Sequence, residues 1–397
     1  MLCSAVLARR GVPVTVLEPN RELGRKLRIT GKGRCNVTNN CDERTVLANM
    51  PVNGRFLFSA LHGLAPADVM ALFEGLGVPL KTERGNRVFP VSDRAGDVAA
   101  ALEAEMRRGG VTVRRTRARG VTAENGAVRA VTTAEGEIPC RAAVIATGGL
   151  SYPATGSTGD GLRFAQSLGH TIVPPRASLV PLTSPGTLCR DLMGLSLRNV
   201  ALSVFEDDQK IYADFGELLF THFGVSGPLV LSASAHMRRF GERTYRLEID
   251  LKPALDEAAL DKRVRADFEK YHNSDFINAL NDLLPKKLIP VMVRCSGIDP
   301  RCKVHSITRE QRGGLVRLMK AFPVPVDGTR PIDEAIITSG GVDVREISPK
   351  TMESKRVHGL YFAGEVLDVD AYTGGFNLQI AWSTAYAAAN AIADALA

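Results

Sequence analysis

The sequence predicts an α/β protein built on a doubly wound, Rossmann-like sheet, interrupted by an inserted domain. At the start of the chain, a short helix, a strand and an acidic residue follow one another between Leu2 and Glu18. Two apolar runs, Ala142–Ala146 and Gly359–Ala363, have the length of buried strands, and glycine follows each run closely. Between these runs the pattern changes, with a group of prolines that opens at Pro174. The chain is therefore expected to form one domain from its two ends and a second domain from its middle.

The boundaries of the insert follow from this change of pattern. We expect residues 171–332 to form a substrate or cap domain, with a β part at about 174–252 and a helical part at about 253–320. Residues 1–170 and 333–397 remain for the sheet domain. No motif in the insert identifies its substrate.

Composition narrows the class of protein. The 397 residues are 45% hydrophobic, which is enough to fill two cores. No apolar stretch reaches the length of a membrane span and no signal peptide is recognisable, so we expect a cytoplasmic protein that does not enter a membrane. Seven scattered cysteines without a Cys-x-x-Cys pair argue against a disulfide framework and a zinc site. We expect no metal, and the oligomeric state is left open.

The net charge of +7 is concentrated in two clusters. A solvated surface is the commoner explanation of such clusters, and a nucleic acid or another polyanionic substrate is the alternative. One cluster comprises Arg107, Arg108, Arg114, Arg115, Arg117 and Arg119, and the other comprises Lys286, Lys287, Arg294, Arg301 and Lys303.

The first elements match the second half of a dinucleotide-binding βαβ unit. Leu2–Arg10 is predicted as a helix and Val12–Glu18 as a strand that ends in an acid. In such a unit this acid, here Glu18, accepts hydrogen bonds from a ribose hydroxyl. The preceding strand and its Gly-x-Gly-x-x-Gly turn are not in the sequence, which begins within the helix.

A basic, glycine-rich loop follows at Gly24–Asn36. It has three glycines, three arginines and two lysines in thirteen positions. Glycine allows close approach of the backbone, and Lys and Arg bind phosphate oxygens. The loop is therefore predicted to hold an anion, with a solvated basic turn as the alternative.

The next hundred residues lie between the basic loop and the first buried strand. Residues 39–109 are predicted to be largely helical and loop-like, with helix starts near Pro66 and Asp97. A small antiparallel meander is then expected, with strands at Val111–Val113, Gly120–Thr122, Val128–Thr132 and Glu137–Arg141. It leads into the Ala142–Ala146 strand.

Glycine-rich segments mark the candidate binding edge of the sheet. Thr147-Gly148-Gly149 follows the first buried strand, and Gly364-Glu365 follows the last. Ligands of open α/β sheets bind outside the carboxyl ends of the strands. Gly374-Gly375 precedes the final helix, whose amino terminus would favour negative charge on a bound ring.

Taken together, five stretches resemble the YhiN-like bacterial flavoproteins, the BaiN/RdsA family of NAD(P)/FAD-dependent oxidoreductases. The resemblance covers essentially the whole chain. It implies a glutathione-reductase-type FAD-binding domain, with the inserted domain closing over the flavin. The stretches are Gly24–Asn39, Ala146–Gly161, Phe220–Pro228, Thr338–Val344 and Gly359–Trp382.

The resemblance also implies which residues bind the cofactor. Glu18 would hold the adenosine ribose, and Lys26 with the loop 31–36 would line the cofactor. Residues 147–149 would lie on the adenosine or pyrophosphate side, 364–365 on the pyrophosphate and ribityl chain, and 375–379 at the isoalloxazine. The full implied set is Glu18, Lys26, Gly31, Gly33, Arg34, Cys35, Asn36, Thr147, Gly148, Gly149, Gly364, Glu365, Asp370, Gly375, Phe376, Asn377 and Gln379.

The sequence departs from the family at one point. The family begins with a strand and a Gly-x-Gly-x-x-Gly-type turn, and this sequence starts about where that turn would finish. We expect a start site placed too late, because every later motif is intact. We also expect the 397-residue chain to bind FAD weakly.

The family resemblance implies reduction of an activated carbon–carbon double bond with NAD(P)H, in a steroid-like molecule or in a uracil ring of ribosomal RNA. Such a reduction needs a general acid beside the flavin. Cys35 is the first candidate, with a buried packing cysteine as the alternative, and Tyr152 and His222 follow. The basic clusters favour the RNA substrate.

Two other functions stay open. One is an oxygen-using oxidase of amines such as aminoacetone. The other is a non-catalytic RNA-binding or assembly protein with a vestigial flavin site.

Overall fold

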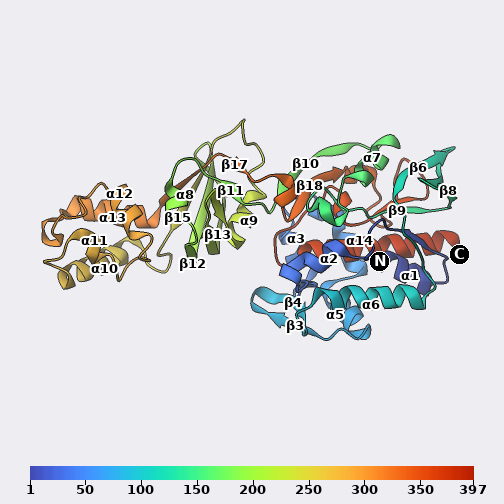
Figure 1. Ribbon diagram of the computed structural model, residues 1–397, viewed down its shortest axis with the longest axis horizontal. Coiled ribbons are helices and arrows are strands. Elements are labelled where there is room, and N and C mark those ends of the chain that lie inside the picture. The colour runs from blue at the N-terminus through green and yellow to red at the C-terminus, as the bar shows by residue number, and fades with distance from the viewer. The chain divides into compact units, whose positions relative to one another are not determined.

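The computed structural model describes all residues from Met1 to Ala397 and divides the chain into two compact units (Figure 1). Unit 1 comprises Met1–Ser178 and Pro331–Ala397, and unit 2 comprises Leu179–Arg330. The boundary predicted at residue 171 is wrong by one strand. Strand β10 (Ile172–Ser178) belongs to unit 1 because it pairs antiparallel with β18 (Ile337–Val342).

Two pairs of parallel strands form the centre of unit 1. Strand β1 (Thr15–Leu17) pairs with β5 (Thr112–Arg114), and β9 (Ala143–Ile145) pairs with β19 (Leu360–Phe362). The β9–β19 pair joins segments from the two ends of the chain. Parallel pairing through long crossover connections is typical of a Rossmann-like fold, so the predicted α/β class is confirmed. The segment Val111–Val113, predicted as part of the meander, instead supplies β5, because it pairs with β1.

Two small antiparallel sheets complete the strands of unit 1. The predicted meander is present as β6 (Ala118–Glu124), β7 (Ala127–Thr133) and β8 (Gly136–Pro139). A second sheet, of order β2-β4-β3, lies in the stretch predicted to be helical and loop-like. Its strands are β2 (Thr38–Asn39), β3 (Leu80–Glu83) and β4 (Arg87–Pro90).

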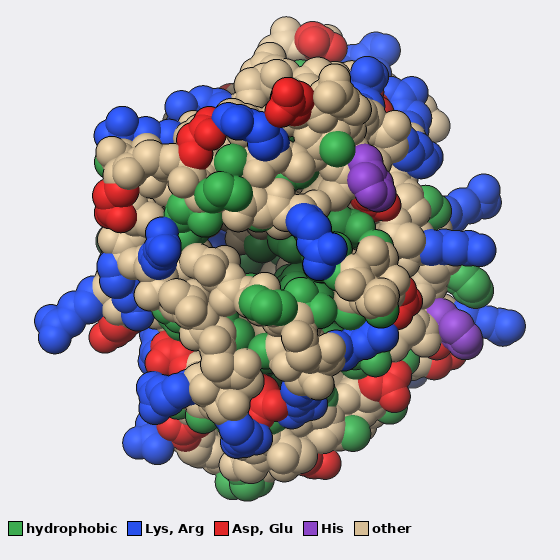
Figure 2. Space-filling view, turned by 90° about the vertical axis from the view of Figure 1, so that its right-hand side faces the viewer, with side chains coloured by type: hydrophobic (Ala, Val, Ile, Leu, Met, Phe, Trp, Pro, Cys, Tyr) green, Lys and Arg blue, Asp and Glu red, His purple; other side chains and the backbone are tan.

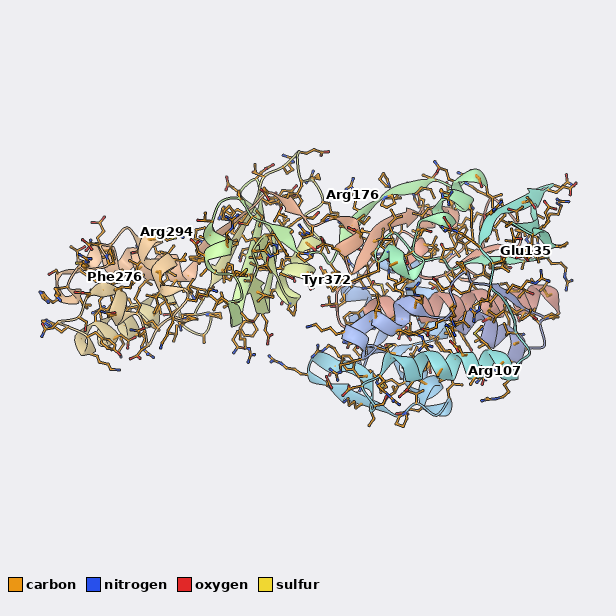
Figure 3. The ribbon with its side chains drawn as sticks, in the orientation of Figure 1. Arg107, Glu135, Arg176, Phe276, Arg294 and Tyr372 are labelled. Carbon is orange, nitrogen blue, oxygen red and sulfur yellow. The ribbon has the colours of Figure 1, made fainter.

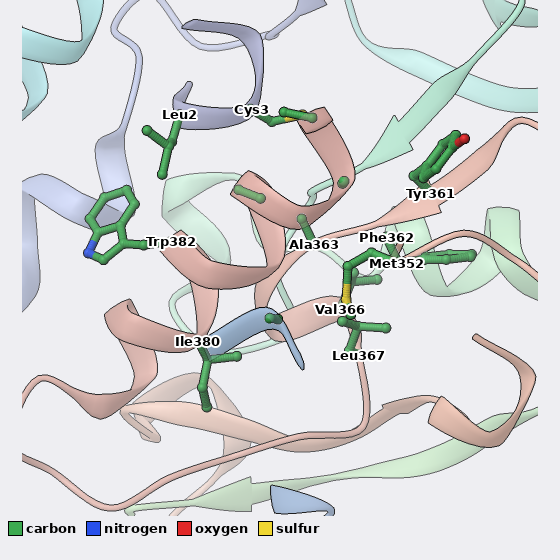
Figure 4. Close-up of a cluster of buried hydrophobic side chains, with 14 of the residues drawn as sticks. Leu2, Cys3, Met352, Tyr361, Phe362, Ala363, Val366, Leu367, Ile380 and Trp382 are labelled. Carbon is green, nitrogen blue, oxygen red and sulfur yellow. The ribbon is translucent and has the colours of Figure 1, made fainter. Parts of the chain in front are cut away.

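The carboxyl-terminal helix α14 (Phe376–Leu396) is the central helix of unit 1. Its residues Ile380 and Trp382 belong to a buried apolar cluster that also contains Leu2 and Phe362 (Figure 4). The Trp382 indole N–H donates to the Val37 carbonyl at 2.9 Å, so this ring is both packed and hydrogen-bonded. The other helices of unit 1 are α1 (Leu2–Arg9), α2 (Arg25–Ile29), α3 (Glu43–Ala48), α4 (Phe58–Gly63), α5 (Pro66–Gly75), α6 (Ala95–Arg108) and α7 (Asp160–Ser167).

Unit 2 contains one antiparallel sheet and a group of helices, and both contribute to a single hydrophobic core. The sheet has seven strands in the order β16-β15-β12-β13-β14-β11-β17. The chain returns to this sheet after the helices, so the β part is not confined to residues before 253. The strands are β11 (Leu182–Thr183), β12 (Ser196–Glu206), β13 (Gln209–Phe220), β14 (Gly224–Ser226), β15 (Tyr245–Asp250), β16 (Phe322–Val326) and β17 (Gly328–Thr329).

The helices of unit 2 are short, and their apolar residues join the core of the sheet. They are α8 (Leu188–Asp191), α9 (Pro228–Ser234), α10 (Glu257–Lys270), α11 (Phe276–Ala279), α12 (Ile289–Ser296) and α13 (Arg309–Lys320).

No single helix is long and apolar enough to cross a membrane, and one pair, Gly54–Gly63 with Pro66–Gly75, reaches the required length and composition only together, across a bend of 42°.

Candidate functional site

Two glycine segments meet at one edge of unit 1. Ile145 and Phe362 are register partners in the parallel pair β9–β19, so the carboxyl ends of both strands coincide. Thr147-Gly148-Gly149 leaves the first strand there, and Gly364-Glu365 leaves the second. The structure therefore brings together the two segments that the sequence placed at the binding edge.

A partly buried ionic network joins this edge to the basic loop. The Lys26 ammonium donates to Glu365 Oε2 at 2.6 Å and to Ser151 Oγ at 2.7 Å. Ser151 Oγ donates to Glu365 Oε1 at 3.0 Å, and the Thr338 amide donates to the same oxygen at 2.8 Å. The side chains of Lys26 and Glu365 are only 24% and 18% exposed, so solvent screens this pair weakly. The network fixes helix α2 to the ends of both strands.

Close packing explains why glycine occupies position 149. A Cβ atom on Gly149 would lie 2.4 Å from Thr338 Oγ1 and 3.1 Å from Glu365 Oε1. That hydroxyl oxygen accepts hydrogen bonds from the amides of Leu150, at 2.8 Å, and Ser151, at 3.1 Å. A side chain at 149 would therefore displace the group that orders the loop after β9.

The basic loop adopts a strained backbone. Gly31, Lys32, Gly33 and Cys35 have φ of 58°, 60°, 87° and 61°, the left-handed region that suits glycine. Such strain in non-glycine residues is concentrated at functional sites. The neighbouring Arg34 does not offer free charge, because it pairs with Glu83 and Asp93 and lies 4.1 Å over the Phe89 ring. Its hydrogen bond is the main cause that lowers the pKa of Glu83.

The end of this loop has one unpaired polar atom. Asn36 Oδ1 is buried and has no hydrogen-bond partner in the protein. A buried acceptor without a donor is costly, which indicates that a bound group supplies the missing N–H or O–H. Cys35 beside it is 0% exposed and lies in the apolar core. Burial raises the pKa of its thiol to about 12, and this environment favours the packing role over proton donation.

The amino terminus of α14 lies against strand β2. A Cβ on Gly375 would lie 2.4 Å from the carbonyl atoms of Thr38, and the Asn39 side-chain Nδ2 donates to the Gly374 carbonyl at 3.0 Å. The first bond of the helix runs from the Gln379 amide to the Gly375 carbonyl. The three preceding amides have no acceptor within the helix, and the helix dipole adds positive potential there.

Three polar side chains predicted to contact the cofactor are engaged by the protein itself. Asn377 bonds both the amide and the carbonyl of Ala371, at 3.0 and 2.7 Å. Gln379 is fully buried, accepting from the Thr38 hydroxyl at 2.6 Å and donating to the Leu64 carbonyl at 2.8 Å. Asp370 is buried and accepts from the Ser178 hydroxyl at 2.9 Å.

These bonds place Asn377 and Gln379 in the framework of the candidate site. The adjacent Phe376 ring is also buried, in the same core. These side chains therefore hold in place the segments that surround the amino terminus of α14.

Glu18 lies at the end of β1 with one oxygen engaged. Its Oε1 accepts from the Asn20 backbone amide at 2.9 Å and from the Asn20 side chain at 2.7 Å, and no protein donor bonds Oε2. Asn20 is itself held by Arg25, at 2.8 Å, and by the Thr155 carbonyl, at 3.1 Å. The carboxylate is thus oriented and keeps one free acceptor.

The other candidate acids differ in their surroundings. Tyr152 directly follows Ser151 in the chain, has a φ of 52° and is 36% exposed. His222 is exposed in unit 2, with its ring 5.0 Å from Phe223 and no hydrogen bond. Of these candidates, Tyr152 is the exposed one that adjoins in sequence a residue of the Lys26–Glu365 network.

The arginine cluster of residues 107–119 is dispersed. Arg108 pairs with Glu105, Arg115 bonds the Asn20 carbonyl, and Arg117 pairs with Asp160. Half of the cluster is thus engaged inside unit 1. The end of unit 1 seen in Figure 2 has basic and acidic side chains intermingled around an apolar hollow.

Sequence reasoning missed three residues that organise the site. Ser151 and Thr338 belong to stretches that carry the family resemblance, but their bonds to Glu365 join segments far apart in the sequence. Asn20 lies two residues after the predicted ribose-binding acid. An Asn that close to a key carboxylate is a signal that a search for local side-chain hydrogen bonds would find.

Comparison with known proteins gives consistent matches over nearly the whole chain. Residues 1–391 match the family described as HI0933-like protein Rossmann domain. The chain is 33% identical over 396 residues to a ribosomal RNA dihydrouridine synthase of Haemophilus influenzae, covering 99% of this chain and 95% of the relative. It is 32% identical over 391 residues to the Escherichia coli protein of the same name, covering 98% and 94%. It is 29% identical over 402 residues to the 3-dehydro-bile acid delta(4,6)-reductase of Clostridium scindens, covering 99% and 96%.

Proposed function

The chain belongs to the HI0933-like Rossmann-domain family and is an oxidoreductase, and we propose that unit 1 binds FAD and reduces an activated carbon–carbon double bond with NAD(P)H as electron donor. The observation that carries the cofactor assignment is the buried, unpartnered Asn36 Oδ1 at the end of the strained loop. This atom lies in the loop predicted to line the cofactor, and a bound cofactor could supply the hydrogen-bond donor that the protein does not.

The polar groups left open in unit 1 fit this cofactor. Asn36 Oδ1 needs an N–H or O–H donor, which the pyrimidine edge of a flavin provides. Glu18 Oε2 needs a hydroxyl, which the ribose provides. The free amides at the start of α14 need an acceptor, which the ring oxygens provide. Donors and acceptors therefore match in kind.

When bound, FAD supplies the hydride transfer between NAD(P)H and substrate. The network of Lys26, Glu365 and Ser151 holds the two glycine segments in place for binding. The second carbon of the double bond needs a proton, and Tyr152 is the better placed donor because Cys35 is enclosed in the core. We therefore assign the general acid to Tyr152.

We propose a uracil ring of ribosomal RNA as the substrate, with a steroid-like enone as the second candidate. The two relatives named for ribosomal RNA are 33% and 32% identical to the chain, and the bile-acid reductase is 29% identical. A net charge of +7 also favours a polyanion. An RNA substrate would place the enzyme in the cytoplasm.

The test is anaerobic incubation of the FAD-loaded protein with NADH or NADPH and either ribosomal RNA fragments or a steroid enone. Mass spectrometry should detect addition of two hydrogens to a uracil of the RNA. Tyr152→Phe should lower this turnover, and Tyr271→Phe, a substitution in unit 2, is the matched control. Turnover of the enone alone would move the assignment to the steroid substrate. Consumption of oxygen and an amine without NAD(P)H would contradict the reductase.

A further inference from the structure

We propose that a basic surface along helix α12 of unit 2 binds the phosphate backbone of the RNA, an inference that rests on the RNA substrate proposed above. We define the α12 stripe as Arg190, Lys286, Lys287, Arg294 and Arg301, all of which are exposed. Arg294 is labelled in Figure 3.

The stripe follows from the way α12 packs. The helix buries Ile289, Val291, Met292 and Val293 in the core of unit 2, so its opposite side, with Arg294, faces solvent. Lys286 and Lys287 precede the helix, and Arg301 follows its terminal Gly297. Eight helical residues span about 12 Å, so the stripe is long enough to meet several phosphates of one strand.

Helix α8 lies beside α12 and widens the stripe. Arg294 pairs with Asp191 of α8 at 2.7 Å, and the Lys287 ammonium donates to the Met193 carbonyl. These contacts fix the two segments together. Arg190 directly precedes Asp191 in α8 and is exposed.

The charge of the stripe is only partly balanced, because only Arg294 of its five cations pairs with a carboxylate. Arg190, Lys286 and Arg301 have no carboxylate partner, whereas Arg294 pairs with Asp191 and Lys303 pairs with Asp275. On α10 and α13, by contrast, most cations face carboxylates at short range. These pairs are Arg263–Asp267, Arg265–Asp261, Lys270–Asp282, Arg312–Asp261 and Lys320–Asp250.

The surface fits a polyanion better than a protein partner. Protein interfaces are centred on buried aromatic and aliphatic side chains. Met193, 49% exposed, is the one large apolar side chain exposed at the stripe. Arg and Lys side chains with free donors bind phosphate oxygens directly. The charge therefore selects RNA as the occupant.

The experiment compares salt dependence of RNA binding by the FAD-loaded protein. The triple variant Arg190→Gln/Lys286→Gln/Arg301→Gln removes three cations that have no partner in the fold. The matched control, Arg84→Gln/Arg107→Gln/Lys350→Gln, removes three exposed cations of unit 1. Binding of a uridine-containing single-stranded RNA is measured by fluorescence anisotropy at several salt concentrations. Loss of three phosphate contacts should reduce the slope of log Kd against log salt by about 2. At low salt, affinity should fall at least about tenfold in the triple variant.

An unchanged slope in the triple variant, or an equal loss in the control, would overturn the assignment of the stripe. Preference of the wild-type protein for vesicles containing phosphatidylglycerol over RNA would overturn RNA as its occupant. Absence of RNA binding would also overturn the stripe, whereas flavin absorbance of the same sample tests the cofactor separately.

Discussion

Gly149→Ala tests the packing of the candidate site most simply, because it adds one methyl group. The new Cβ would lie 2.4 Å from Thr338 Oγ1 and 2.6 Å from Thr338 Cβ, distances that normal contacts do not reach. No positive φ is involved at Gly149, so the effect is one of space alone. Overpacking of this kind costs about 1–3 kcal/mol. The free energy of unfolding of unit 1 should fall by that amount.

The single tryptophan of the chain provides the assay. Trp382 is buried in unit 1, so its fluorescence during urea unfolding reports on this unit alone. FAD affinity is measured in parallel by flavin fluorescence. We expect both to fall in Gly149→Ala, since Thr338 and Glu365 must shift together.

Two further variants make this result specific. Gly63→Ala is the matched control, because no atom lies within 4 Å of a Cβ there and the residue is helical. Thr338→Gly removes the clashing side chain, so the double variant should be less destabilised than the sum of the single variants. A Gly149→Ala protein as stable as wild type would refute the packing account.

Other predictions follow from single contacts. Lys26→Met and Glu365→Gln should each weaken FAD binding at least tenfold in a titration, because each leaves the partner's charge unpaired and weakly screened by solvent. The loss of binding free energy in the double variant should be smaller than the sum of the two single losses. The pKa of Glu346 is lowered to about 2, chiefly by the Arg356 hydrogen bond, so its stabilisation is present above pH 4.5 and is lost as the pH falls toward 2. The difference in urea stability between wild type and Glu346→Gln should therefore narrow over that range. A constant difference would contradict a stabilising role of the ionised Glu346 carboxylate. Cys35→Ala should lower the free energy of unfolding by about 1 kcal/mol yet keep substrate turnover, and lost turnover in a folded, FAD-loaded variant would restore Cys35 as the acid.

The central strands of unit 1 could be predicted from the sequence because their local pattern is clear. Ala142–Ala146 and Gly359–Ala363 are apolar runs followed closely by glycine, and both supply neighbouring parallel strands. The sheet β2-β4-β3 was missed because its strands have two to four residues and carry little periodicity. Pairing of β5 with β1 was missed for another reason, since it depends on a partner nearly a hundred residues away.

The chemistry of individual site residues was harder to predict, because it depends on tertiary partners. Arg34 has a sequence context suited to phosphate, yet Glu83 and Asp93 engage its charge. Gln379 was expected at the ring of the cofactor, and in the structure its side chain hydrogen-bonds to Thr38 and Leu64 inside the protein. No local pattern predicts such long-range bonds.

The central claim is that unit 1 holds FAD through the loop that ends at Asn36, and a titration of the purified chain with FAD tests it most directly. Absorbance and flavin fluorescence should change saturably at one FAD per chain, even if the affinity is modest. Asn36→Leu, which removes the unpartnered acceptor, should weaken binding at least tenfold with little loss of stability. If saturating FAD leaves both signals unchanged in the folded wild-type chain, the flavin assignment is contradicted.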